Sequence, residues 1–259
     1  PVWVLARLIW TWLEGGTLGF YYRDFTEKSP TASVNPARGE YAFFFPRHQK
    51  AYGVSFTQQF FGVSFGADIV RRQNAVLNSM IQNGSLDAAR GNAWTGLING
   101  IKIFGPNNVW SSATALVEIG YSRLDKVTAN EQFFPACEKR PAGDQGANTG
   151  CSTRDNWVAA VRFAPNWTAV FPGWDASASL GLSYGLKGNS PLILPDHGQE
   201  RAGSYSVGTT WTYNSRHDFT LAYVGYLATR ETLNGAIRVS NGSQRQDRGW
   251  LSFSYKGSF

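Results

Sequence analysis

The sequence predicts an all-β protein built from long antiparallel strands, on three observations. Apolar and polar residues alternate through many stretches, as in strands with one apolar and one polar face. Several stretches reach about nine to eleven residues, the length of a membrane-spanning strand, whereas soluble strands average about five or six. No run of about eighteen apolar residues occurs, so a transmembrane helix is not expected. These features predict an antiparallel transmembrane β-barrel of the bacterial outer membrane, where lipid-facing and lumen-facing residues alternate.

The end of the chain shows the alternation most clearly. Leu251, Phe253 and Tyr255 share one parity, serine and lysine fill the other, and the chain ends on Phe259. A terminal aromatic after an alternating strand is typical of the closing strand of an outer-membrane barrel. For this strand alone, the edge strand of a soluble sandwich is the alternative.

Recurrence of the same pattern favours the barrel. The alternation runs through residues 61–70, 113–122, 176–187 and 204–213. Aromatic residues make up 15% of the chain and charged residues only 16%. Tryptophans gather near predicted strand ends, where barrels carry aromatic girdles at the membrane interfaces. Ordinary core aromatics are the alternative for these residues.

Eleven strands are predicted in all. In chain order they are Val2–Trp12, Leu18–Phe25, Ala51–Gln58, Phe61–Val70, Trp94–Phe104, Ser112–Leu124, Trp157–Phe171, Asp175–Lys187, Gly203–Tyr213, Asp218–Thr229 and Gly249–Phe259. The first stretch also suits a short helix. Single-chain bacterial barrels usually have even strand numbers, and no signal peptide precedes Pro1. We therefore expect residues 1–259 to form a single β-barrel domain that lacks N-terminal sequence and is part of a larger barrel. A complete ten-stranded barrel with an N-terminal tail is the alternative.

Short and long connections alternate along the chain. The short ones are Leu13–Thr17, the neighbourhood of Phe60, Gly105–Trp110, Pro172–Trp174 and Asn214–His217, and the long ones are Thr26–His48, Arg72–Asn92, Val127–Asp155, Asn189–Arg201 and Glu231–Arg248. Outer-membrane barrels have short periplasmic turns and long extracellular loops. If Phe259 lies at the periplasmic rim, every long connection falls outside the cell.

The net charge of +6 does not indicate nucleic acid. Lysine and arginine are scattered through loops, with neither a basic helix nor a stacking platform. Basic residues in outer loops instead predict contact with the phosphates of lipopolysaccharide, and the strands predict contact with outer-membrane lipid.

The two cysteines, Cys137 and Cys151, lie in one polar loop. In a protein of an oxidising compartment this predicts a local disulfide. A metal site is the alternative, but His48, His197 and His217 do not have ligand spacing. We expect no metal and no cofactor.

The residues do not predict an enzyme. A serine hydrolase needs serine, histidine and an acid within reach of one another, whereas the three histidines fall in loops or turns. No Gly-x-Ser-x-Gly elbow opens a helix, and the glycines of 181–185 lie within a strand rather than in a phosphate-binding loop. No catalytic residue is therefore predicted.

Charged residues on the polar parity of the strands are the candidate functional residues. They are Arg23, Asp68, Glu118, Arg162, Lys187 and Lys256, all predicted to face the lumen. One interpretation is that they pair across the lumen and stabilise it, and this is favoured for Asp68 and Glu118 because a buried acid without a partner is costly. The other is that they line a polar pathway.

Six motifs in order resemble one known family. They are Gly19-Phe20-Tyr21-Tyr22-Arg23-Asp24-Phe25 with Ser29-Pro30, Tyr52-Gly53-Val54-Ser55-Phe56, Glu118-Ile119-Gly120, Phe171-Pro172-Gly173-Trp174-Asp175, Gly185-Leu186-Lys187-Gly188-Asn189-Ser190-Pro191, and Asp247-Arg248-Gly249-Trp250 leading to Phe259. The chain resembles the proteobacterial domain-of-unknown-function family 1302, which is placed among outer-membrane barrels. It departs from that family at Phe25–Lys28, where a His-Ser-Arg run is frequent.

The resemblance implies a role in the Gram-negative envelope. It implies a longer N-terminal sequence, a periplasmic or lipoprotein partner, an RND-type transporter for hydrophobic molecules, and an assembly machinery that reads Phe259. Two functions are compatible with the sequence. One is a channel or transfer component for hydrophobic or amphipathic molecules, and the other is a structural or interaction component of an envelope assembly with a plugged lumen.

Overall fold

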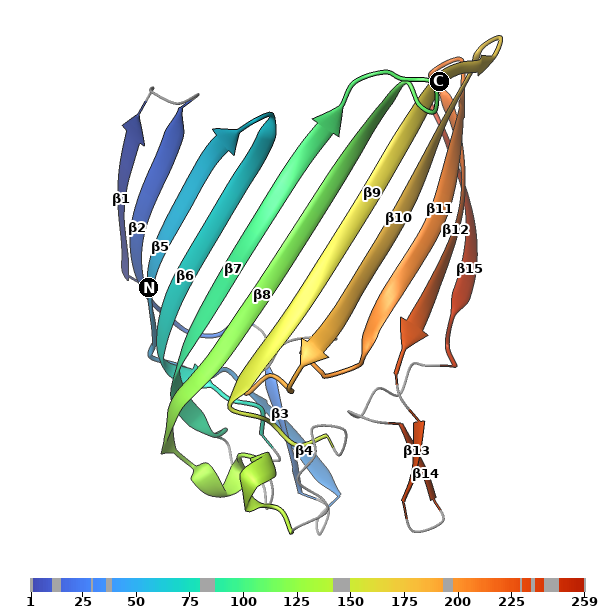
Figure 1. Cartoon of the computed structure of the whole chain (residues 1–259). Coiled ribbons are helices and arrows are strands. Elements are labelled where there is room, and N and C mark those ends of the chain that lie inside the picture. Colours follow the sequence, from blue (N-terminus) through green and yellow to red (C-terminus); the bar gives the residue numbers. More distant parts are fainter. Residues whose placement is uncertain are drawn as a thin grey trace.

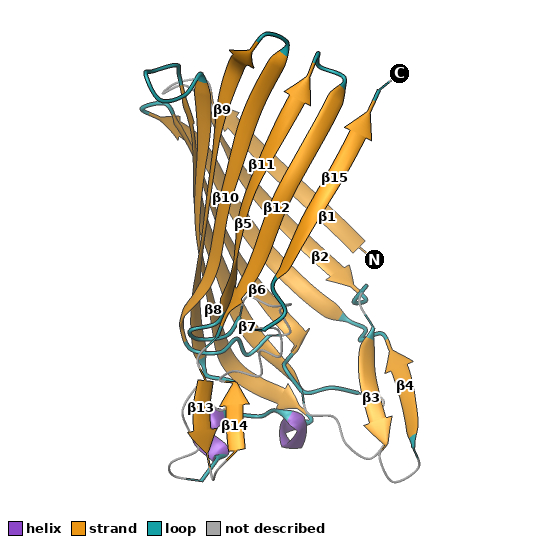
Figure 2. Cartoon of the chain, turned by 90° about the vertical axis from the view of Figure 1, so that its right-hand side faces the viewer, coloured by secondary structure: helices purple, strands orange, loops and turns teal. Residues whose placement is uncertain are grey.

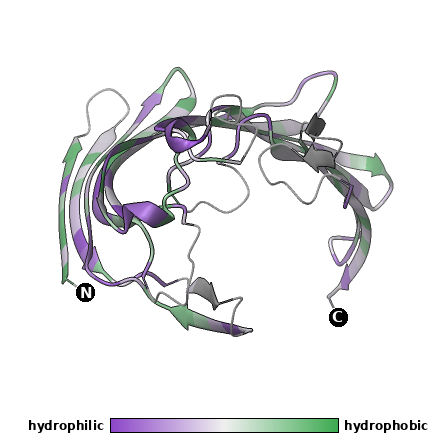
Figure 3. Ribbon diagram, turned by 90° about the horizontal axis from the view of Figure 1, so that it is seen from below, coloured by the Kyte–Doolittle hydropathy of each residue, from purple (hydrophilic) through white to green (hydrophobic). Residues whose placement is uncertain are grey.

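The fold is one antiparallel sheet of eleven strands that curves into an open arc (Figures 1 and 3). The computed structural model describes residues 2–10, 15–28, 30–35, 39–79, 87–141, 150–192, 198–228, 230–233, 236–239 and 247–258. No helix within these ranges is long and apolar enough to cross a bilayer.

Strands that are neighbours in the sheet follow one another along the chain. The order is β1 (Val2–Trp10), β2 (Gly16–Phe25), β5 (Gln49–Phe60), β6 (Val63–Val76), β7 (Arg90–Phe104), β8 (Ser112–Ala129), β9 (Asp155–Phe171), β10 (Trp174–Lys187), β11 (Gly203–Tyr213), β12 (His217–Leu227) and β15 (Trp250–Gly257). Each pairs antiparallel with the next. β1 and β15 are the two edges, and each has one strand neighbour.

The eleven predicted strands are all present, most of them with shifted ends. The stretch from Val2 is a strand rather than a helix, since Val2–Trp10 pairs with β2 over its whole length. Phe61 was predicted to begin a strand, which is wrong. It lies in the turn after β5 with a φ of 50° and precedes Gly62, which has a φ of 72°. The positive φ values suit the tight reversal between the two strands.

Short and long connections lie at opposite ends of the sheet (Figure 1). We call these the turn end and the loop end. The long connections contain elements that the sequence did not predict: two hairpins, β3 (Thr31–Asn35) with β4 (Glu40–Phe44) and β13 (Arg230–Leu233) with β14 (Ala236–Val239), and the short 3-10 helices η1 (Glu131–Phe133) and η2 (Cys137–Lys139). Figure 2 shows them below the sheet. The alternation of short and long connections along the chain thus separates the molecule into two different ends.

Buried apolar side chains gather at the loop end rather than along the middle of the sheet. They are Ala75, Leu77, Ala89, Ala93, Leu124, Phe134, Ala136 and Leu192. Leu77, Phe134, Ala136 and Leu192 come from three long connections, and we call them with the Cys137–Cys151 loop the loop cluster. Seen along the strands, the short helices lie inside the arc (Figure 3). The loop cluster therefore packs against the inner wall of the sheet.

Candidate functional site

Strand register assigns every side chain of the sheet to one of two faces. Leu182 on β10 is directly opposite Val161 on β9, and 44% of its surface is exposed. Its neighbour Gly181 is opposite Arg162. Since successive residues of a strand point to opposite faces, one face carries leucine and valine while the other carries glycine and arginine.

The polar face is the concave one. At the loop end, Ala93, Ser122, Leu124 and Asn156 have its parity and are buried under the loop cluster, which lies inside the arc (Figure 3). The convex face therefore carries most of the large exposed apolar side chains. Large exposed members of the convex face are Val54, Ile69, Ile98, Ile119, Val161, Leu182, Val207, Leu221 and Phe253.

Five of the six charged residues singled out from the sequence lie on the concave face. Each has a small or polar residue opposite it on one neighbouring strand, such as Ser55 for Asp68 and Gly181 for Arg162. On the other neighbouring strand, Asp68 is opposite Leu97 and Arg162 is opposite Leu116. The five are Arg23, Asp68, Glu118, Arg162 and Lys256.

Lys187 departs from the predicted parity. A register shift between Gly185 and Lys187 sets Lys187 opposite Trp157. Trp157 lies on the convex face, in register with Tyr121. Because a β-bulge places two residues opposite one, it reverses the alternation beyond it. Lys187 therefore belongs with the convex face at the loop end, and strict alternation along the sequence does not reveal such a shift.

The five concave charges are not brought together. They come from five different strands, and none takes part in an ion pair within the part of the chain that the structure describes. Even Lys256, which is directly opposite Asp218, makes no such contact. The pairing favoured from the sequence for Asp68 and Glu118 is thus not seen among the described residues.

Sequence reasoning missed Arg72. The strand predicted there ended at Val70, whereas β6 continues to Val76. Arg72 has the parity of Asp68 and is in register with Ala51 on β5. Its spacing of four residues from Asp68 is the signal that could have placed it on the concave face.

The concave face of β10, β11, β12 and β15 carries small uncharged side chains through its middle. A hollow of about 350 Å³ lies over this area, with Arg162 and Val224 in its lining. Small side chains leave more of the concave space open here than Arg, Tyr or Leu would. The series is Ser177, Ser179, Gly181, Ser183, Ser204, Ser206, Gly208, Thr210, Thr220, Ala222, Ser252 and Ser254.

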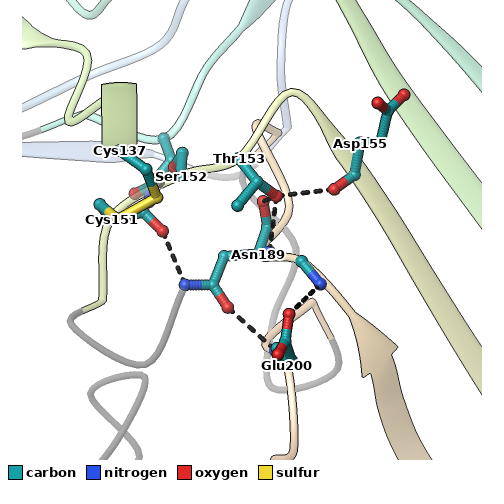
Figure 4. Close-up of a disulfide and its surroundings, with 9 residues drawn as sticks. Cys137, Cys151, Ser152, Thr153, Asp155, Asn189 and Glu200 are labelled. Carbon is teal, nitrogen blue, oxygen red and sulfur yellow. Dashed lines mark hydrogen bonds between the residues drawn. A yellow bond between two sulfur atoms is a disulfide. The ribbon is translucent and has the colours of Figure 1, made fainter. Parts of the chain in front are cut away.

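The predicted disulfide is present in the loop cluster (Figure 4). The sulfur atoms of Cys137 and Cys151 are 2.03 Å apart, and the two residues are 14 positions apart in the chain. Cys151 is fully buried. The bond closes the connection between β8 and β9 on itself.

Asn189 joins the disulfide loop to the connection after β10 (Figure 4). Its side-chain amide Nδ2 donates to the Cys151 carbonyl at 2.6 Å, and its Oδ1 accepts from the Glu200 backbone N–H at 2.9 Å. The Thr153 hydroxyl donates to the Asn189 carbonyl at 3.0 Å. These bonds fix two long connections against each other.

Asn156 anchors this network to the wall. Its side chain lies on the concave face of β9 and is 1% exposed. Its Nδ2 donates to the carbonyls of Gly188 at 3.0 Å and Gly198 at 3.3 Å. The sequence did not distinguish Asn156 or Asn189 from asparagines that terminate strands or form turns.

Potential metal sites are clusters of ligating side chains. No group of three or more His, Cys, Asp or Glu side chains gathers anywhere in the described ranges. The His217 Nδ1 lies 2.8 Å from the Tyr255 hydroxyl on the convex face at the turn end. His197 and the predicted assembly residue Phe259 lie outside the described residues.

Comparison with known proteins gives a family and no function. No curated protein and no solved structure matches the chain. Residues 5–259 match the family described as a protein of unknown function, DUF1302. The match extends over every strand of the sheet, and the chain therefore belongs to the DUF1302 family.

Proposed function

We propose that the eleven-stranded sheet is the wall of an outer-membrane β-barrel that serves as a channel or transfer component for hydrophobic or amphipathic molecules. The convex face would contact lipid, and the concave face would line the passage. The observation that carries the proposal is the division of the sheet into an apolar convex face and a polar concave face.

An apolar surface of this extent is unusual in a soluble protein. Monomeric soluble proteins rarely expose contiguous apolar patches larger than a few hundred Å². Here large apolar side chains of the convex face are exposed on neighbouring strands, including Ile98, Ile119, Val161 and Leu182. On the other side, the same strands bury Ala93, Ser122 and Asn156, and Leu124 where the loop cluster covers it. A lipid contact on the convex face explains both facts.

Aromatic residues mark both ends of the convex apolar band. On β9, Trp157 lies towards the loop end and Trp167 towards the turn end, with Ala159, Val161 and Phe163 on the same face between them. Ten residues extend about 33 Å along a strand, or about 23 Å across a membrane at a tilt of about 45°. Barrels have an apolar band about 25 Å tall between aromatic girdles.

Basic side chains lie on the convex face beyond the loop-end girdle. Arg71 packs over the Trp94 ring at 5.1 Å and forms an ion pair with Asp125 at 3.6 Å. Arg123 and Lys187 are at the same end. If the loop end is extracellular, these cations lie at the level of the lipopolysaccharide phosphates, which they would attract.

The proposal requires both sheet edges to be paired in the membrane. β1 and β15 each have one strand neighbour, and an open edge leaves backbone N–H and C=O groups without partners. Such groups are costly in hydrocarbon, where only closed barrels and helices are stable.

The loop cluster supports the second candidate, a structural or interaction component whose lumen is plugged. It packs inside the arc at the loop end and is held there by the disulfide and by Asn156. In either role, a periplasmic or lipoprotein partner and an RND-type transporter remain family-level proposals.

Two measurements test the proposal. Fractionation of a Gram-negative host should recover the full chain with the outer membrane, and recovery only in soluble fractions would refute the barrel. The purified protein in a planar bilayer should then give discrete conductance steps. Absence of steps in the wild type and their appearance in a C137S/C151S variant would favour the plugged lumen.

A further inference from the structure

We infer that the concave face carries a binding site for one anionic headgroup of an amphipathic molecule, a carboxylate or a phosphate, between Arg23 and Arg72. The inference rests on the proposed function, because it names the chemical class of molecule that the concave face would accept.

The two arginines flank one small residue. Arg23 on β2 and Arg72 on β6 are both in register with Ala51 of the strand between them. Two strand spacings separate their Cα atoms by about 10 Å. Between them, the methyl group of Ala51 leaves room for one planar or tetrahedral anion. Arginine suits such a group because its planar guanidinium donates two parallel hydrogen bonds to carboxylate or phosphate.

Neither arginine has an anionic partner among the residues that the structure describes. The Nε atoms of Arg23 and Arg72 are both shielded from solvent without a hydrogen bond, and neither side chain forms an ion pair. The nearest acid of the concave face along β6 is Asp68, about 13 Å from Arg72 along the strand. Glu27 accepts from the Gln49 side chain at 3.2 Å, two residues from Ala51 on the same face, and forms no ion pair with either arginine among the described residues. Two neighbouring cations that pair with no acid repel each other, and one bound anion would remove that repulsion.

The adjacent Arg71 shows the contrast. It belongs to the convex face, where Asp125 and the Trp94 ring already engage it. One step along the same strand, Arg72 has neither kind of partner within the described ranges. The two arginines therefore differ in the face of the sheet on which they lie. Arg71 is for this reason a matched control for substitutions of Arg72.

Aromatic rings hold Arg23 in place. Its guanidinium carbon lies 4.2 Å from the centre of the Trp3 ring and 4.4 Å from that of Phe25. Cation–π contacts leave the guanidinium edge, which carries the donors, free for an anion. A side chain fixed in this way loses less conformational entropy on binding.

A strip of largely apolar residues beside the arginines would contact the alkyl chain of the amphipathic molecule. Leu5 and Ile9 of β1 have the parity of the concave face, and 75% and 66% of their surfaces are exposed. Arg7 lies between them on the same face, where its guanidinium donates to the Thr17 hydroxyl at 3.4 Å. Tyr21, opposite Leu5, lays its ring over Gly53 of the next strand. The strip runs from the arginines towards the turn end, so a molecule with its headgroup at Arg23 and Arg72 would place an alkyl chain along it.

Equilibrium binding to the full chain in zwitterionic-lipid nanodiscs tests the inference. The probes are radiolabelled dodecanoate, dodecyl phosphate and dodecanol, with inorganic phosphate as a competitor. We expect both anions to bind at least about tenfold more tightly than dodecanol, as charge-assisted hydrogen bonds require. Arg72→Gln should weaken anion binding at least about tenfold, and R23Q/R72Q further. Arg72→Lys should bind with intermediate strength, whereas Arg71→Gln should bind as wild type.

Each outcome decides. Equal affinity for dodecanol and dodecanoate, or an unchanged affinity of the folded Arg72→Gln variant, would overturn the headgroup site. Inorganic phosphate competing as well as dodecyl phosphate would overturn the role of the apolar strip. Preference between dodecanoate and dodecyl phosphate identifies the headgroup. Selective anion binding without conductance would refute the channel but support the headgroup site. Conductance without selective anion binding would refute the headgroup site but support the channel.

Discussion

The side-chain amide of Asn189 donates a 2.6 Å hydrogen bond to the carbonyl of Cys151. This bond ties the connection after β10 to the disulfide loop after β8. Both residues are buried, at 4% and 0% exposure. The loop cluster is thereby a single packed unit rather than a set of separate loops.

Replacing Asn189 should loosen this unit without unfolding the sheet. Asn189→Ala removes one buried and one partly buried side-chain hydrogen bond, and loss of the partner of a buried backbone group costs about 1–3 kcal/mol. Amide hydrogen exchange should speed up at residues 150–153 and 198–202. Asn107→Ala is the control, because the Asn107 side chain also makes two hydrogen bonds to backbone groups, accepting both, but lies in a turn-end connection. Faster exchange throughout the sheet would contradict a local role.

The disulfide should be complete in the isolated protein. Denatured, non-reduced protein should take up no thiol reagent, and reduced protein should take up two equivalents; labelling before reduction would show that Cys137 and Cys151 are not bonded. A loop of 14 positions contributes about 3 kcal/mol in the chain-entropy account. The C137S/C151S variant should therefore be cleaved faster by protease in residues 130–154, while its β-sheet circular dichroism stays unchanged.

Much of the sheet was predictable because apolar and polar residues alternate wherever the convex and concave faces have different surroundings. Along β10 and β11 every second residue except Thr209 is apolar, and both strands were placed to within one residue of their observed ends. At the loop end the same logic fails. Ala75, Ala93 and Leu124 are apolar and buried on the concave face, since the loop cluster covers them. Apolar and polar residues therefore no longer alternate at the loop end, and the C-terminal end of β6 was predicted six residues too early.

The candidate site was predictable only in part. Parity alone placed Arg23 and Glu118 on the concave face. It misplaced Lys187, because one inserted residue reverses the alternation without a clear mark in the sequence. The network around Asn189 joins residues more than 30 positions apart in the chain, such as Cys151. Contacts between irregular segments that are so far apart in the chain produce no periodic pattern in the sequence from which they could be predicted.

A charge placed on the convex face should hinder assembly. Leu182→Arg would put a guanidinium into lipid at a cost of roughly 2–4 kcal/mol near the midplane of the membrane. The folded, heat-modifiable form in the outer-membrane fraction should decrease. Ser206→Arg introduces the same charge on the concave face of the next strand and should assemble normally. Equal loss in both variants would count against a lipid-facing convex surface.

Charges on the concave face should set what passes rather than whether the protein folds. Glu118 and Arg162 take part in no ion pair among the described residues, so removing either leaves no buried partner charge there. Glu118→Ala should lower cation preference and Arg162→Ala should lower anion preference, shifting the reversal potential in a salt gradient in opposite directions.

Lys187→Ala supplies the control for these variants. Lys187 was predicted to face the lumen, but the β-bulge places it on the convex face. Because the substitution removes no charge from the passage, the reversal potential of the variant should match that of the wild type. A shift as large as that of Arg162→Ala would show that Lys187 faces the passage and that the register at Gly185 is different in the membrane. If the wild-type protein gives no conductance and neither Glu118→Ala nor Arg162→Ala changes the uptake of an amphipathic probe, the channel is refuted. The plugged structural component is then the function that the concave face and its loop cluster support.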